Sequence, residues 1–229
     1  MFTTIKRWFL LTLLLILLVS FFYFDLHHYL TYETLKKYQT FATQWTAQHY
    51  FQATVLYILV FTLLIACAVP CATFLTLLGG FLLGTIAIPY AVFATTFGGL
   101  ILCLAVRMSV GAGFTTSTGV VKRFERGFKR NAFMYILMLR LVPIFPCWIS
   151  NVSAGALNVP LKTFIAATVL GVFPATFVYA MVGRGLGKVF EQDTSPSYTI
   201  IFTPSILLPL IAMIIISLLP IIYHFIKRK

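Results

Sequence analysis

The fold of this chain is decided by the stretch LMLRLVPIFPCWISNVSAGA, Leu137–Ala156, in which an apolar run carries one arginine and two prolines. A proline inside a helix removes a backbone donor and clashes with the preceding turn. Pro143 and Pro146 therefore predict the end of a helix that begins near Ala132. Carbonyl groups freed in this way cannot face lipid, so we expect this backbone to be covered by protein or to line a wet cavity.

Arg140 makes the same stretch chemically unusual, because an unpaired arginine at mid-membrane costs roughly 3 kcal/mol. The sequence offers as partners the freed carbonyl groups, Ser150, Asn151, water or an anionic ligand, since every Asp and Glu lies in a polar connection. Two interpretations follow. Arg140 either caps carbonyl groups or snorkels to the cytoplasmic surface, or it holds a phosphate-type headgroup with help from donors at the next helix start.

The composition identifies an all-α, polytopic membrane protein. Of the 229 residues 60% are hydrophobic and only 10% are charged, against about 25% in a soluble domain. No charged residue occurs between Lys37 and Arg107, which far exceeds the roughly 20 apolar residues that cross a bilayer once.

The net charge of +12 comes from basic clusters at Lys6–Arg7, Lys122–Arg130 and Lys227–Lys229, each beside an apolar segment. This distribution is typical of the positive-inside rule and predicts anionic lipid headgroups as partners. Nucleic acid is not expected as a partner.

Catalytic and metal sites are not predicted. The four cysteines form no CxxC pair, no histidine is spaced to complete a metal site, and histidines and acids lie at segment edges. We therefore expect no enzyme activity, no metal and no cofactor.

Five spanning helices are predicted at most, at residues 8–24, 51–69, 85–106, 161–182 and 199–226, so the expected architecture is four to five spans plus two re-entrant hairpins. The hairpins are expected near 70–84 and 132–158. An interfacial helix is expected within 25–50, and 107–131 is either an amphipathic surface segment or a solvated loop. These elements divide the chain into an N-terminal helix and amphipathic segment at 1–50, a membrane domain at 51–187, and a loop, final helix and basic tail at 188–229.

The first hairpin rests on a short uncharged stretch that begins at Pro70 and contains Gly79, Gly80 and Gly84. Its 15 residues are too few to cross comfortably as a helix. Pro70-Cys71 begins nine residues before Gly79, and Pro146-Cys147 begins nine residues before Gly155. Such paired, interrupted segments in two halves of a chain predict an inverted repeat with the substrate site between them.

Four motifs carry a family resemblance: LRLVPIFPCWISNVSAG, FIAATVLGVFPATFVYAMVGRGLG, VPCATFLTLLGGFLLG and AVRMSVG. Together they resemble the DedA superfamily, also called the VTT-domain or SNARE-associated Golgi protein family, from about Tyr57 to Gly187. The matching positions are Arg140, Pro143, Pro146, Asn151, Gly155, Gly171 and Pro174. The resemblance implies two re-entrant hairpins that face one another, and a role in moving lipids between leaflets. The lipid is undecaprenyl phosphate in bacterial members and phospholipid in eukaryotic ones.

Two departures from the DedA branch narrow this implication. Pro146 stands where that branch has a second arginine, and the first hairpin lacks the acidic residues associated with proton coupling. The chain therefore resembles the branch without those acidic residues, which includes Golgi proteins and their bacterial relatives.

The function expected from these observations is a scramblase- or flippase-like translocator of phosphate-headgroup lipids. Its substrate-binding residues are expected to be Arg140, Asn151, Ser150 and Arg107. Snorkelling is the alternative role for Arg107, and a helix cap is the alternative role for Asn151. An ion- or proton-coupled transporter of a small solute is the alternative function. A purely structural or partner-binding role also stays open, and a homo-oligomer is compatible with all of these.

The membrane expected for this chain is a bacterial inner membrane, because the chain is compact. A Golgi or ER membrane is the alternative.

Overall fold

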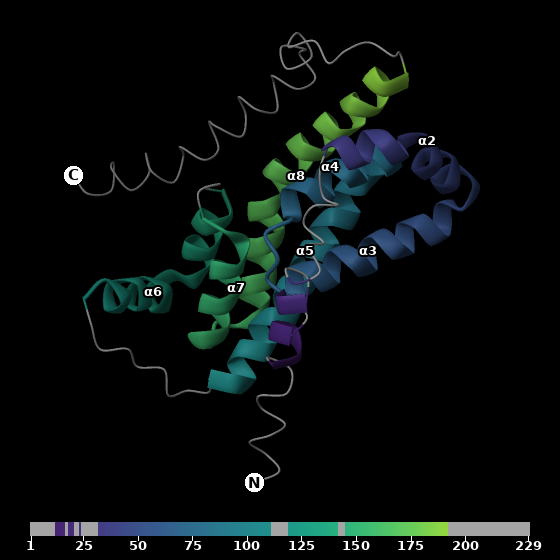
Figure 1. Ribbon diagram of the computed structural model, residues 1–229. Helices are drawn as coiled ribbons and strands as arrows, with labels where there is room; N and C mark the ends of the chain where they lie inside the picture. The colour runs from purple at the N-terminus through teal and green to yellow at the C-terminus, as the bar shows by residue number, and fades with distance from the viewer. Residues whose placement is uncertain are drawn as a thin grey trace, which may run out of the picture.

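The computed structural model is all-helical (Figure 1) and describes residues 12–16, 18–20, 23, 32–110, 119–141 and 145–191. Its elements are α2 (Tyr32–Gln48), α3 (Tyr50–Ala66), α4 (Ala72–Leu83), the 3-10 turn η2 (Gly84–Ile86), α5 (Ala87–Val110), α6 (Gly119–Leu141), α7 (Cys147–Ala156) and α8 (Leu161–Glu191). Pro143 and the predicted last helix, 199–226, lie outside the described residues.

Two helical stretches of the described chain are long and apolar enough to cross a membrane, Ala72–Ser109 and Leu161–Gly185. A third is added if Thr40–Gln48 and Tyr50–Ala66, which meet at an angle of 114°, count as one broken span. The chain is therefore an all-helical integral membrane protein. The larger number of four to five spans stays a prediction.

Helix α8 runs through the middle of the bundle, with α6 and α7 on one side and α2 and α3 on the other (Figure 1). It contacts α4, α5 and α6 along its length. Apolar side chains fill two clusters. One joins α3, α4 and α5 around Phe61 and Ile65, and the other joins α5, α6, α7 and α8 around Ile136 and Phe164.

Helix α4 occupies most of the predicted first hairpin. Its 12 residues span roughly 18 Å at 1.5 Å per residue, which is shorter than the roughly 30 Å hydrocarbon core. Its C-cap is Gly84, whose φ of +67° lies in the left-handed region that favours glycine. The chain continues through η2 into α5, and a re-entrant path for this stretch stays a prediction.

Close packing of α4 against α8 explains why Gly80 has no side chain. It also identifies a second glycine at this contact, Gly183. A Cβ atom at Gly80 would overlap the carbonyl group of Ala180, and a Cβ atom at Gly183 would overlap that of Leu77. Backbone this close to backbone admits only glycine, as at small-residue contacts between membrane helices. Gly80 was expected only as a glycine of the first hairpin, and Gly183 was not among the predicted residues.

Helix α6 includes the later part of the basic connection, from Gly119 onward, and the first arm of the second hairpin. Residues 119–130 are helical, so the alternative of a bare solvated loop is wrong there. At Asn131 the backbone leaves helical geometry (φ −155°, ψ 75°), and its Oδ1 accepts a hydrogen bond of 3.2 Å from the Met134 N–H. Asn131 therefore acts as the N-cap of a second helical segment, which begins at 132, where the predicted hairpin begins.

Candidate functional site

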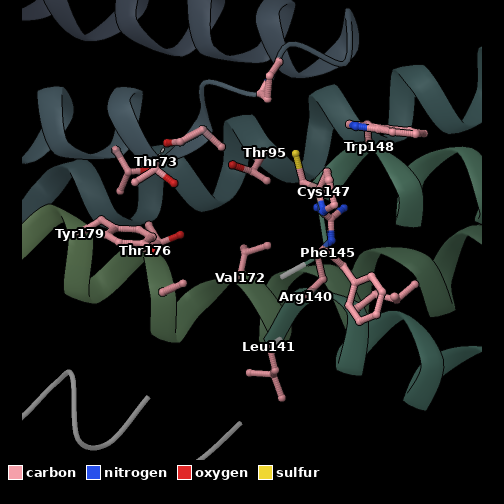
Figure 2. A pocket seen from close by; sticks show the side chains of 16 residues that line it. Thr73, Thr95, Arg140, Leu141, Phe145, Cys147, Trp148, Val172, Thr176 and Tyr179 are labelled. Carbon is pink, nitrogen blue, oxygen red and sulfur yellow. Dashed lines mark hydrogen bonds between the residues drawn. The ribbon is translucent and has the colours of Figure 1, made fainter. Parts of the chain in front are cut away.

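A cavity of about 220 Å³ lies where α4, α5, α6, α7 and α8 meet (Figure 2). Its walls hold one arginine, hydroxyl side chains and aromatic rings among apolar groups: Pro70, Ala72, Thr73, Thr76, Thr95, Leu139, Arg140, Leu141, Phe145, Pro146, Cys147, Trp148, Val172, Ala175, Thr176 and Tyr179. Among these lining residues none is Asp, Glu, Lys or His. The cavity therefore carries a positive charge and no counter-ion from its own walls.

The first turns of two helices lie at this cavity, one from each of the two Pro-Cys segments. Pro70 and Ala72 line it at the start of α4, and Pro146 and Cys147 line it at the start of α7. Neither helix has a side-chain cap, since no such hydrogen bond is made by Cys71 or Pro146. Uncapped N–H groups and the positive end of each helix dipole favour an anion at such a place. The structure thus brings the two interrupted segments to one cavity.

Arg140 lies in the last turn of α6 and is only 8% exposed. Its Nη2 donates a hydrogen bond of 2.5 Å to Asn151 Oδ1. Its Nε and Nη1 are buried and have no hydrogen-bond partner among the described residues. Since the side chain is buried, the snorkelling interpretation of Arg140 is wrong.

Gly171 explains how this arginine fits beside α8. A Cβ atom at Gly171 would overlap the Cβ of Arg140, so the glycine allows α6 and α8 to approach at this point. Pro174 follows one turn later within α8, and the helix continues through it.

Asn151 is fully buried in α7 and packs against α5, where a Cβ atom at Gly99 would lie 2.8 Å from its Oδ1. It does not line the cavity. The helix-cap interpretation is wrong, because α7 begins after its N-cap Pro146 and Asn151 lies inside the helix. Asn151 therefore bonds the guanidinium of Arg140 from a position outside the cavity lining.

The other two predicted site residues point elsewhere. Ser150 is buried and its hydroxyl donates a hydrogen bond of 2.9 Å to the Cys147 carbonyl oxygen, within its own helix. Arg107 donates from Nη2 to the Val159 carbonyl oxygen, which follows the end of α7. Neither residue lines the cavity. Arg107 therefore fastens α5 to the connection between α7 and α8, in place of simple snorkelling.

The glycine of the second Pro-Cys segment has a packing role as well. A Cβ atom at Gly155 would overlap the Cys103 carbonyl oxygen, so Gly155 lets α7 lie against α5. Gly79, in the first segment, instead faces the ring of Tyr57 in α3. The two glycines thus hold equivalent positions in the two Pro-Cys segments, but they contact different helices.

The hydroxyl residues of the cavity were missed by the sequence analysis. They come from α4, α5 and α8 and are Thr73, Thr76, Thr95, Thr176 and Tyr179. The available signal was the presence of threonines inside otherwise apolar segments. This signal is weak, because a threonine hydroxyl can also bond to a carbonyl group of its own helix.

Comparison with known proteins gives a family match. The VTT domain family matches residues 69–185. The chain is 29% identical over 181 residues to Transmembrane protein 41B of Mus musculus and of Homo sapiens, covering 76% of this chain and 60% of each relative. It is 28% identical over 165 residues to Transmembrane protein 41 homolog of Caenorhabditis elegans, covering 67% of this chain and 65% of that relative. The chain thus spans about 60% of the length of the first two relatives. No solved structure matches it.

Proposed function

This chain belongs to the VTT domain family, and on that premise we propose that it is a lipid translocator, which lets phosphate-headgroup lipids such as phospholipid or undecaprenyl phosphate exchange between leaflets. The lipid movement implied by the family resemblance is one support. The chemistry of the cavity is the other, and it comes from this chain's own residues.

The observation that carries the proposal is the state of Arg140. Arg140 lines the cavity and is almost fully buried, and two of its guanidinium nitrogen atoms have no partner among the described residues. A buried charge needs compensation, and its described hydrogen-bond partner, Asn151, is neutral. A phosphate group would supply the missing negative charge and accept several hydrogen bonds from the flat guanidinium.

The two helix starts add to this attraction. The first turns of α4 and α7 lie at the same cavity as Arg140 and lack side-chain caps. Their N–H groups and dipoles would stabilise a phosphate as helix N-termini do elsewhere. A headgroup would thus exchange its water shell for oriented donors partway through the membrane.

The size of the cavity favours the headgroup alone. Its volume of about 220 Å³ is below the roughly 300–1,000 Å³ of pockets that enclose drug-sized ligands. The acyl chains would therefore remain in the bilayer while the headgroup crosses. Phe145 and Trp148, which line the cavity and are 45% and 40% exposed, offer apolar surface to those chains.

Passive exchange fits the cavity better than pumping. A proton-coupled transporter, the alternative function, needs a titratable group or carboxylate at depth, and the described residues that line the cavity include no Asp, Glu or His. We therefore propose equilibration of lipid between leaflets without an energy source.

The membrane in which this takes place is part of the proposal. A bacterial inner membrane was expected from the compact chain, whereas the relatives named above are animal proteins, which supports the Golgi or ER alternative. Fractionation of the native host's membranes decides between the two.

The test is a leaflet-exchange assay with the full chain reconstituted in vesicles that contain acyl-labelled phospholipid or labelled polyprenyl phosphate. We expect Arg140→Ala to lower the exchange rate at least about tenfold, the loss of a charged hydrogen bond. Arg130→Ala is the matched control, because Arg130 is on the same helix and exposed. Equal rates for Arg140→Ala and the parent would overturn the proposal.

A further inference from the structure

We propose that the cavity has a second subsite, formed by its threonine and tyrosine hydroxyl groups, that selects net-anionic headgroups which themselves carry hydroxyl groups, such as glycerol or inositol phosphodiesters. We call this part of the cavity the hydroxyl end and define it as Thr73, Thr76, Thr95, Thr176 and Tyr179. The inference rests on the proposed lipid exchange and adds the class of headgroup.

Three residues of the hydroxyl end lie apart from the arginine within the shared cavity, and Thr95 is seen between them and Cys147 (Figure 2). Figure 2 shows the guanidinium of Arg140 beside Cys147, while Thr73, Thr176 and Tyr179 gather on the opposite side of the cavity. The hydroxyl residues come from three helices, α4, α5 and α8. A ligand that reaches from the guanidinium to the hydroxyl end therefore needs two polar parts.

The hydroxyl groups of Thr95 and Thr176 are available to such a ligand. Both residues are only 6% exposed, both line the cavity, and no hydrogen bond within the described chain occupies either hydroxyl. The Thr76 hydroxyl donates 2.7 Å to the Ala72 carbonyl oxygen and keeps its lone pairs as acceptors. Neither the Thr95 nor the Thr176 oxygen is among the fully buried, unpartnered atoms of the described chain, so a hydroxylated ligand or water in the cavity can bond to both.

The neighbouring Thr96 behaves differently and provides a reference. Its hydroxyl donates 2.7 Å to the Val92 carbonyl oxygen inside α5, and the residue does not line the cavity. Thr168, on α8, is fully buried and also lies away from the cavity. The polar lining is therefore a property of particular helix faces, and these two threonines serve as matched controls.

The charge of the walls decides which headgroup fits. Arg140 is positive, and the described residues of the lining include no carboxylate. In a site of low dielectric, a headgroup ammonium would meet a like charge without a partner. A phosphodiester with hydroxyl groups pairs with the guanidinium and places neutral donors and acceptors at the hydroxyl end.

The volume is adequate for both parts. The cavity's roughly 220 Å³ is several times the roughly 30 Å³ that one water molecule occupies in the liquid. A phosphate and a small polyol can therefore be present together.

The experiment compares three acyl-labelled lipids in vesicles that contain the full chain: phosphatidylglycerol, phosphatidylmethanol and phosphatidylcholine. Phosphatidylmethanol has the same negative phosphodiester as phosphatidylglycerol but no headgroup hydroxyl, so it separates charge from hydrogen bonding. We expect phosphatidylglycerol to exchange about threefold to tenfold faster than phosphatidylmethanol, the effect of one to two hydrogen bonds. Phosphatidylcholine is expected to be the slowest.

The variants assign the effect to the hydroxyl end. Thr95→Val combined with Thr176→Val removes two hydroxyl groups at nearly constant volume and should bring phosphatidylglycerol down to the rate of phosphatidylmethanol. The control pair, Thr96→Val with Thr168→Val, should keep the parental preference. A monodisperse elution profile and an unchanged helical circular dichroism spectrum establish that each variant is folded.

The outcomes separate this inference from the proposed function. The proposed role of the hydroxyl end is overturned if all three lipids exchange at equal rates. It is also overturned if the preference for phosphatidylglycerol persists in the variant with Thr95→Val and Thr176→Val. In both cases the proposed lipid exchange stands. Exchange of phosphatidylcholine that is faster than that of phosphatidylglycerol also overturns the role of the hydroxyl end. It would indicate that the headgroup ammonium binds the aromatic rings of Phe145 and Trp148. No exchange of any lipid by folded protein overturns both. Uptake of radiolabelled glycerol 3-phosphate without lipid exchange would show that the site takes a soluble phosphate ester. It would overturn the proposal that the ligand is a lipid headgroup.

Discussion

Arg140 Nη2 donates a hydrogen bond of 2.5 Å to Asn151 Oδ1 and so joins the last turn of α6 to the middle of α7. The bond uses one edge of the guanidinium and leaves Nε and Nη1 without a partner in the described chain. Asn151 is held in turn against α5 at Gly99. The bond thus sets where the charge points, and the first two predictions below depend on this arrangement.

Arg140→Lys is expected to restore only part of the exchange lost in Arg140→Ala. An ammonium keeps the charge, but it lacks the planar fork that would bond Asn151 and a phosphate together. The exchange rate should fall between those of the parent and Arg140→Ala in the same vesicle assay. A lysine variant as active as the parent would show that charge alone suffices.

Asn151→Ala should slow exchange less than Arg140→Ala does, because it frees the guanidinium without removing it. The two substitutions should not add in the double variant, since both act on one hydrogen bond. Ser150→Ala is the control, because the Ser150 hydroxyl bonds within its own helix and is away from the cavity. Additive losses would mean that Asn151 acts independently of Arg140.

Gly80→Ala should lower the stability of the protein in detergent by about 1–3 kcal/mol, the usual result of overpacking. The added methyl group would overlap the Ala180 carbonyl group and push α4 from α8. A thermal melt followed by circular dichroism measures the change, and Gly183→Ala should match it. Gly79→Ala is the comparison, because its methyl group meets the Tyr57 side chain, and Tyr57→Leu should relieve it. An unchanged melting temperature for Gly80→Ala would contradict the close approach.

Arg107→Ala should reduce stability by about 1.5–3 kcal/mol, the value of a hydrogen bond to a charged group. It removes the bond to the Val159 carbonyl oxygen, and it leaves the cavity lining intact. The protein that remains folded should therefore keep the parental preference among headgroups. A change in that preference at full stability would place Arg107 in contact with the lipid.

The exchange rate should be flat from about pH 6 to pH 8, the range in which histidine titrates. The described lining contains no histidine, Asp or Glu, so no imidazole or carboxyl group there changes charge in that range. A pH gradient across the vesicle should likewise leave the rate unchanged when the mean pH is held constant. Net accumulation of lipid in one leaflet, driven by the gradient, would favour the coupled transporter.

The amino-acid sequence by itself determined the class of this protein and the places where its helices are interrupted. The length of the apolar segments determines that the chain inserts in a membrane. Backbone N–H and C=O groups in lipid need hydrogen-bond partners within the chain, and here helices provide them. Pro70 and Pro146 precede the starts of α4 and α7 because proline acts on the backbone next to it, whatever the rest of the fold does. Arg140 was recognisable because a permanent charge in an apolar run is costly wherever it points.

Only the tertiary structure decided the partners of these residues. Ser150 and Asn151 are adjacent in the sequence and equally polar, yet Asn151 bonds Arg140 while Ser150 bonds its own helix. Arg107 turned out to hold a backbone carbonyl group, and threonines on three helices came to line one cavity. Such choices depend on the rotation and separation of helices that are far apart in the chain. Hydrophobic periodicity records which segments are buried, but it carries no information on which buried side chain meets which.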